Sequence, residues 1–80
     1  MKAVVTIRPR PSVLDPQGQA VAGALRHLGF DEVESARQGK IIELVLQDAD
    51  PDAARARLDR MCRELLANTV IEDYQITLEP

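Results

Sequence analysis

Cys62 and His27 have side chains suited to nucleophilic or acid–base catalysis, and each is the single residue of its type in the sequence. A catalytic cysteine needs an accessible thiolate and a neighbouring base. Cys62 instead lies in an apolar stripe between Met61 and Leu65, which predicts a buried structural thiol. His27 falls on the polar side of a predicted helix, near the end where the helix dipole favours a cation. We therefore expect no catalytic residue on this chain.

Two spacings are similar to ligand-binding motifs but lack the residues that would complete them. The run Asp48-Ala49-Asp50-Pro51-Asp52 has alternate carboxylates, but the later glycine and the terminal glutamate of a calcium loop are missing. Helix capping explains this run better. Gly18 and Gly23 have the spacing of a phosphate-binding loop, yet Ala24 and Leu25 stand where lysine and a hydroxyl are required. The sequence predicts neither a metal site nor a nucleotide site.

Basic residues near the predicted strand ends could meet and contact a phosphate or a carboxylate. They are Arg8, Arg10, Arg37 and Lys40. Solvated strand ends are the alternative explanation. Thirteen acidic against ten basic residues give a net charge of −3, and the two aromatic residues lie outside basic runs. This composition argues against binding to nucleic acid.

The elements that must position these residues follow one another in the order βαββαβ. Alternating β-branched residues predict strands, and apolar residues at three- and four-residue spacing predict helices. Each helix begins with an aspartate cap followed by proline, at Asp15-Pro16 and Asp50-Pro51. The predicted strands cover 2–8, 32–37, 40–46 and 70–78, and the predicted helices cover 15–28 and 50–68.

Apolar stripes mark the helix faces that should pack on the sheet. The first stripe consists of Ala20, Val21, Ala24, Leu25 and Leu28. The second consists of Ala54, Leu58, Met61, Cys62, Leu65 and Leu66. Gly29 is expected to supply the left-handed residue that ends the first helix, with Phe30 folding back on its last turn.

Gln38-Gly39 could form a two-residue turn between the second and third predicted strands. That turn would place Arg37 opposite Lys40 and Glu34 opposite Glu43. The resulting fold is an α/β (α+β) two-layer sandwich of ferredoxin-like type, an antiparallel sheet with two helices on one face, forming a single domain over 1–80. The other face would expose a set of apolar residues, Val4, Ile41 and Val45, which predicts a homo-oligomer contact.

Oligomerisation is also favoured by size. An 80-residue chain builds only a small core. A single cysteine cannot form an internal disulfide, and the sequence has no cluster of metal ligands, so neither kind of cross-link is expected to stabilise the fold. The chain has no long apolar run, so we expect a cytoplasmic protein that binds no membrane.

Four segments, in order along nearly the whole chain, resemble the PurS family, the small subunits of phosphoribosylformylglycinamidine synthase (FGAM synthase). The segments are Val13-Leu14-Asp15-Pro16-Gln17-Gly18, Leu28-Gly29-Phe30, Arg37-Gln38-Gly39-Lys40 and Leu65-Leu66-Ala67-Asn68-Thr69-Val70-Ile71-Glu72-Asp73-Tyr74. Ser12 and Thr69 depart from the family pattern, where glycine and proline are usual, and both lie in predicted loops.

The resemblance implies a non-catalytic subunit of a multi-chain, ATP-dependent carbon–nitrogen ligase in purine (IMP) biosynthesis that takes its ammonia from glutamine. Formylglycinamide ribonucleotide is converted to formylglycinamidine ribonucleotide on other chains. A synthetase subunit (PurL) holds ATP and Mg, and a glutaminase subunit (PurQ) releases ammonia. The small subunit, as a homodimer or tetramer, bridges these two chains and supports ammonia transfer.

Residues of the matching segments are the candidates for the partner interface. They are Asp15, Pro16, Gln17, Gly18, Arg37, Gly39, Lys40, Asn68, Glu72, Asp73 and Tyr74. The residues themselves leave two other classes open. One is a dimeric small-molecule-sensing regulatory domain of ferredoxin-like fold, and the other is a small enzyme on that fold, which the lack of a nucleophile–base pair disfavours.

Overall fold

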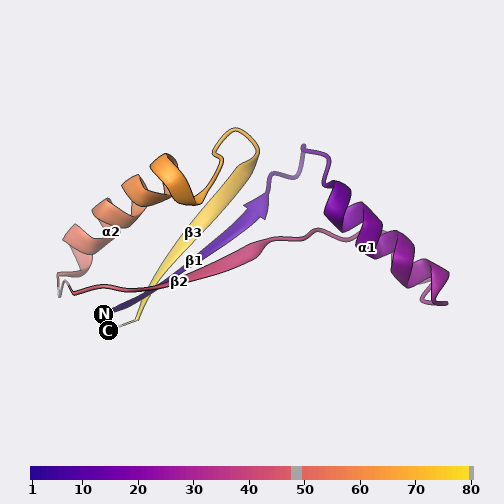
Figure 1. Ribbon diagram of the computed structural model, residues 1–80, viewed down its shortest axis with the longest axis horizontal. Helices are drawn as coiled ribbons and strands as arrows, with labels where there is room; N and C mark the ends of the chain where they lie inside the picture. The colour runs from indigo at the N-terminus through magenta and orange to yellow at the C-terminus, as the bar shows by residue number, and fades with distance from the viewer. Residues whose placement is uncertain (48–49, 80) are drawn as a thin grey trace.

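The computed structural model describes residues 1–47 and 50–79 as an antiparallel sheet with two helices (Figure 1). The elements are β1 (Lys2–Pro9), α1 (Pro16–His27), β2 (Lys40–Val45), α2 (Pro51–Met61), η1 (Cys62–Leu66) and β3 (Glu72–Glu79). The sheet has the order β2-β1-β3, and β1 pairs antiparallel with both neighbours. The predicted α/β class, with two helices and an antiparallel sheet of ferredoxin-like type, is confirmed.

One face of the sheet forms the core together with α2. The central strand β1 contributes Ala3, Val5 and Ile7, which are completely buried. Their cross-strand neighbours on this face are Leu44, Ile42, Leu78, Ile76 and Tyr74. Leu58 of α2 and Cys62 of η1 complete the core, also without exposed surface. The prediction that Cys62 is a structural core residue is confirmed.

A single π-helical turn, η1, follows α2 and changes which side chains face the core. The amide of Ala67 donates to the carbonyl of Cys62, five residues earlier, at 2.9 Å. Such a turn is wider than an α-helical turn and rotates the following side chains about the axis. Leu66 therefore packs against the core, whereas Leu65 is 84% exposed. The predicted place of Leu65 in the buried stripe is wrong.

The segment 32–37 is not a strand, so the predicted hairpin and its register are wrong. β2 pairs with β1, which places Lys40 opposite Ile7 and Glu43 opposite Val4. A type I′ or II′ turn would require a positive φ, and among the described residues only Gly29 has one. The segment satisfies its backbone groups elsewhere, because Arg26 of α1 donates to the carbonyls of Val33 and Glu34 at 3.0 and 3.3 Å.

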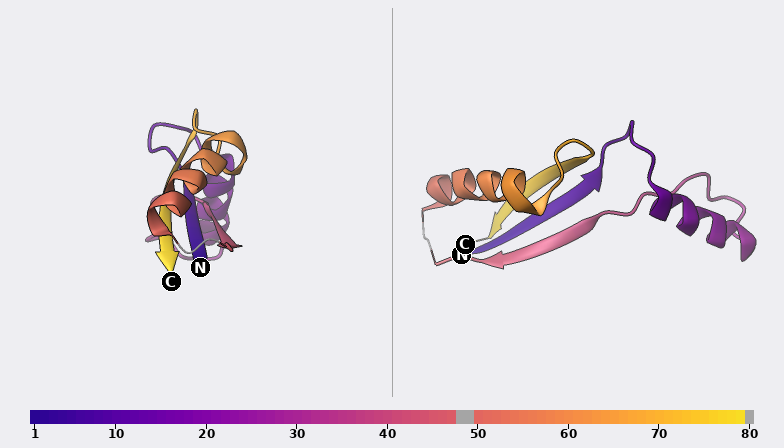
Figure 2. Two further views of the ribbon diagram at one scale, coloured as in Figure 1. Left: turned by 90° about the vertical axis from the view of Figure 1, so that its left-hand side faces the viewer. Right: turned by 45° about the horizontal axis from the view of Figure 1, so that its top comes forward.

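Residues 15–38, called the arm below, consist of α1 and the segment that returns beside it. The arm extends beyond the end of the sheet, while α2 covers the sheet (Figures 1 and 2). The expectation that both helices pack on one sheet face is therefore wrong for α1. In α1 only Gly18 and Ala22 are buried. Val21 is 43% exposed, and Leu28, the C-cap residue, is 73% exposed. Most of the predicted stripe of α1 thus faces solvent.

The ends of α1 follow the sequence prediction. Asp15 is the N-cap, and its side chain accepts from the amide of Gly18 at 3.1 Å. At the other end Gly29 has a φ of 103°. The amide of Phe30 donates to the carbonyl of Leu25 and that of Gly29 to the carbonyl of Arg26, both at 3.0 Å. This is the Schellman arrangement, which confirms the predicted left-handed end of the helix.

The arm makes the molecule long for its size. The radius of gyration is 16.0 Å and the principal extents are 49 × 25 × 14 Å. A compact chain of this length has a radius of gyration of about 12 Å. The fold therefore consists of a packed sheet-and-helix layer and an arm with little core of its own.

Candidate functional site

The junction between the arm and the sheet is braced by Arg37. Its guanidinium donates to three successive backbone carbonyls, those of Pro9 at 3.4 Å, Arg10 at 2.9 Å and Pro11 at 2.6 Å. These carbonyls belong to the chain that leaves β1 toward the arm, so Arg37 ties the outgoing and returning segments together. Arg37, predicted as an interface residue, has this bracing function within the chain.

Asp15 makes a second tie between the start of α1 and the returning segment. Its Oδ2 accepts from the amide of Gln38 at 2.8 Å, while Oδ1 accepts from the amide of Gly18. Hydrogen bonds from the amides of Gln38 and Gly18 hold the pKa of the Asp15 carboxyl below its ordinary value. The carboxylate form therefore stabilises the folded arm.

Two glycines of the matching segments permit close backbone approaches. A Cβ at Gly18 would lie 2.2 Å from the carbonyl oxygen of Ala36, and a Cβ at Gly39 would lie 2.5 Å from that of Ile7. Any side chain at either position would displace the returning segment. Gly18 and Gly39 thus shape the arm, and their residue type needs no partner chain to explain it.

The loop between η1 and β3 is held by its own polar side chains. The Asn68 Oδ1 accepts from the amide of Val70 at 3.2 Å, and the Glu72 Oε1 accepts from the amide of Asn68 at 2.8 Å. Asp73 forms an ion pair with Arg10 at 3.6 Å. These bonds hold the loop that leads into β3.

Tyr74 connects β3 to α2 through its hydroxyl group, which donates to Oδ1 of Asp59. This hydrogen bond to a carboxylate, followed by burial, raises the pKa of the phenol. Asp59 was not among the predicted site residues, and in the structure it also pairs with Arg63 at 3.1 Å. Tyr74 thus packs against the core and fixes α2 on the sheet.

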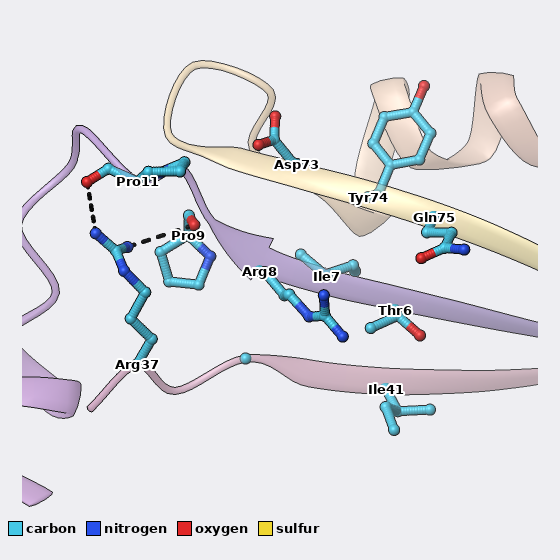
Figure 3. A pocket seen from close by; sticks show the side chains of 11 residues that line it. Thr6, Ile7, Arg8, Pro9, Pro11, Arg37, Ile41, Asp73, Tyr74 and Gln75 are labelled. Atoms are coloured by element: carbon cyan, nitrogen blue, oxygen red, sulfur yellow. Dashed lines mark hydrogen bonds between the residues drawn. The ribbon is translucent and has the colours of Figure 1, made fainter. Parts of the chain in front are cut away.

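A cavity of about 700 Å³ lies on the side of the sheet opposite α2, where β1 leaves toward the arm. Figure 3 shows its lining, with Arg8, Thr6 and Gln75 projecting from neighbouring strands and Arg37 reaching up to Pro9 and Pro11. Of the predicted basic cluster, Arg8 and Arg37 line this cavity. Arg10 instead pairs with Asp73, and Lys40 lies opposite Ile7 on the other side of the sheet. The structure therefore brings together only two of the four basic residues. The sequence did not predict that Thr6 and Gln75 would line the same cavity.

The face of the sheet opposite α2, called the bare face below, carries the predicted homo-oligomer residues. Val4 pairs with Glu43, Ile41 with Thr6, and Val45 with Lys2, so all three apolar residues share this face. Ile41 is 65% and Val45 87% exposed. Glu34, which the predicted hairpin placed here, lies in the arm.

Cys62 and His27 do not come together in a reactive site. Burial raises the pKa of the Cys62 thiol, which opposes formation of a thiolate. Among residues 1–47 and 50–79, no group of three or more His, Cys, Asp or Glu side chains could hold a metal ion. Asp50 caps α2 by accepting from the amide of Asp52 at 3.1 Å, while Asp48 of the calcium-like run lies outside the described residues. No helix in the described part of the chain has the length and apolar character to cross a membrane.

Comparison with known proteins identifies the family to which the chain belongs. Residues 2–80 match the family model described as PurS, phosphoribosylformylglycinamidine (FGAM) synthase. The phosphoribosylformylglycinamidine synthase subunit PurS of Mycobacterium leprae is 49% identical over 78 residues, which are 98% of this chain and 95% of that protein.

Solved structures agree with the family match. The structure of Bacillus subtilis PurS superposes with a TM-score of 0.90 at 44% identity, covering 99% of this chain and 98% of that chain. A chain in the structure of PurLQS from Thermotoga maritima superposes with a TM-score of 0.83 at 30% identity, covering 95% and 93%. Fold, site geometry and comparisons agree, and the chain belongs to the PurS family of FGAM synthase subunits.

Proposed function

We propose that this chain is the non-catalytic bridging subunit of a cytoplasmic FGAM synthase. In that role it joins a synthetase chain and a glutaminase chain and supports transfer of ammonia between them. The observation that carries the proposal is the family match over residues 2–80, together with the similarity to a chain of the Thermotoga maritima PurLQS structure.

The catalytic work belongs to the partner chains in this proposal. ATP and Mg are held by the synthetase, and the nucleophile that releases ammonia from glutamine is on the glutaminase. The described residues of this chain support that division, because the thiol of Cys62 is buried with a raised pKa and His27 is the exposed last residue of α1 in the arm. A buried, protonated thiol is a poor nucleophile.

The exposed side of the arm and the neighbouring sheet end are the proposed docking surface for the large partners. Gln17 and Lys40 are exposed there, and no described residue bonds to either side chain. Pro16 is exposed beside Gln17. The remaining candidates contribute indirectly. Asp15, Gly18, Arg37 and Gly39 shape the arm and its junction with the sheet, whereas the other four hold the loop before β3 and fix α2 on the sheet: Asn68, Glu72, Asp73 and Tyr74.

The bare face is proposed as the contact between copies of this chain, giving a homodimer or tetramer. Exposed Ile41 and Val45 on a flat sheet face gain free energy when another copy covers them. In Val45→Asp the buried carboxylate would cost several kcal/mol in the assembled state. Sedimentation of the variant should show dissociation, with Ala56→Asp on the exposed side of α2 as control. A monomeric wild type at micromolar concentration would contradict this contact.

The bridging role is tested by mixing the purified chain with its synthetase and glutaminase and analysing the mixture by size-exclusion chromatography with light scattering. All three chains should elute together, and Lys40→Glu should weaken this assembly while circular dichroism remains unchanged. Failure of the wild-type chain to join either partner would overturn the proposal.

A further inference from the structure

The cavity at the junction of arm and sheet contains an arginine whose charge no other residue neutralises. Arg8 is exposed and forms neither a hydrogen bond nor an ion pair with any described residue. Its cross-strand neighbour is Asp73, but the carboxylate of Asp73 pairs with Arg10. Arg10 also donates to the carbonyl of Thr69 at 2.5 Å, so Arg10 is held by two groups of the segment that leads into and begins β3.

The cavity therefore carries an excess of positive charge. Arg37 also lines it, and its partners are three neutral carbonyl groups, which bind the guanidinium but do not cancel its charge. Arg8 and Arg37 thus concentrate positive charge at this place in a chain whose net charge is −3. A carboxylate placed beside Arg8 could accept two parallel N–H groups from its planar guanidinium.

Polar and apolar groups surround Arg8 in a way that suits a carboxylate-bearing side chain. Thr6 and Gln75 are cross-strand neighbours on the same face as Arg8, and both can donate hydrogen bonds. Pro9 and Pro11, where β1 leaves toward the arm, offer an apolar surface in the same cavity. A guanidinium, two neutral donors and an apolar contact fit the carboxylate and methylene groups of Asp or Glu.

The openness of the cavity favours a protein occupant over a free small molecule. Most lining side chains are exposed: Arg8, Pro11, Arg37, Ile41, Asp73 and Gln75. Pockets for small molecules bury most of the ligand surface, which these residues cannot do. A protruding side chain would be covered by the protein that carries it.

We propose that this cavity receives an acidic side chain of a partner subunit, with Arg8 as its anchoring residue. The inference rests on the proposed function, since it supposes that the chain docks on a synthetase or glutaminase. It adds the chemistry of the contact and the residue of this chain that recognises it.

The first test measures the affinity of the three-chain assembly for variants of this chain. Arg8→Gln should weaken association at least about tenfold, because it removes a charge-assisted hydrogen bond at the contact. Arg8→Lys keeps the charge without the planar pair of donors and should lose less. Arg60→Gln removes the same charge from the exposed side of α2, where Arg60 pairs with Glu64, and should bind as the wild type does. Salt should weaken the wild type more than Arg8→Gln.

The outcomes separate the two proposals. Absence of binding by the wild type would overturn the bridging role itself. Binding of Arg8→Gln equal to that of the wild type would overturn the acidic contact and leave the bridging role intact.

A second test identifies the occupant. A photo-crosslinking amino acid at Pro11, an exposed lining residue outside the sheet, should label an Asp- or Glu-containing peptide of a large subunit in the assembled complex. Labelling of a second copy of this chain, or dissociation of the homo-oligomer by Arg8→Gln, would instead assign the cavity to self-association and overturn the proposal.

Discussion

The two helices begin with the same Asp-Pro signal and have similar apolar stripes, yet they serve different parts of the molecule. α2 packs on the sheet through Ala54 and Leu58, both essentially without exposed surface. α1 buries only Gly18 and Ala22 and leaves most of its stripe in solvent. A stripe predicts that a helix face will be covered, but it does not say by which chain. The difference indicates that α2 holds the fold and that α1 is available for assembly.

The largest expected difference between the two helices is in their contribution to stability. Leu58→Ala removes a completely buried side chain and should lower the free energy of unfolding by about 2–5 kcal/mol. Leu28→Ala, at a position 73% exposed, should change it by less than about 0.5 kcal/mol. Urea unfolding at one fixed protein concentration measures both, since self-association adds to apparent stability. Equal losses would show that the arm belongs to the same folding unit as the sheet.

The next largest effect concerns the shape of the arm. Gly18→Ala places a Cβ 2.2 Å from the carbonyl oxygen of Ala36, so the returning segment must move, at a cost of about 1–3 kcal/mol within the arm. Gly23→Ala is the matched control. A Cβ at Gly23 meets no atom within 4 Å, and alanine favours the helix by up to about 1 kcal/mol.

Amide hydrogen exchange measures the local stability of the arm separately from that of the sheet. Gly18→Ala should speed exchange over 15–38 and leave the amides of β1 protected, whereas Gly23→Ala should slow exchange in α1. Faster exchange in both variants, or in neither, would contradict the close approach at Gly18.

A smaller effect follows from the ionisation of Asp15. Its pKa in the folded arm is lowered from 3.8 by the hydrogen bonds from Gln38 and Gly18. Stability from a lowered carboxyl pKa is fully present above the unfolded value and is lost as the pH falls through the folded value. Amide exchange in the arm should therefore increase below about pH 4 relative to the sheet. In Asp15→Asn this acid-dependent step should disappear, and its persistence would assign it to another carboxyl group.

The sequence predicted well the elements whose signals are local. Both caps, the left-handed Gly29 and the buried Cys62 depend on residues a few positions apart, and all are confirmed. The absence of a strand at 32–37 could not be predicted, because this run alternates as the strand at 40–46 does and only tertiary contacts decide which of them joins the sheet. In that run the carbonyls of Val33 and Glu34 accept from Arg26, a helix side chain that carries no signal for strand pairing.

The site was predicted only in part for a related reason. The basic residues were recognisable by type, but their partners depend on how the arm returns to the sheet. Arg37 and Arg10 are occupied within the chain, and Arg8 is not. Which arginine is available for a partner therefore follows from tertiary contacts and could not be read from residue type.

In the proposed function this chain acts by assembly and not by its own chemistry. The most direct measurement is the rate of glutamine-dependent formation of formylglycinamidine ribonucleotide by the synthetase and glutaminase, with and without this chain. The two large subunits alone should form little product from glutamine, addition of this chain should restore the rate, and this chain alone should form none. An unchanged rate on addition, or turnover by the isolated chain, would contradict the account.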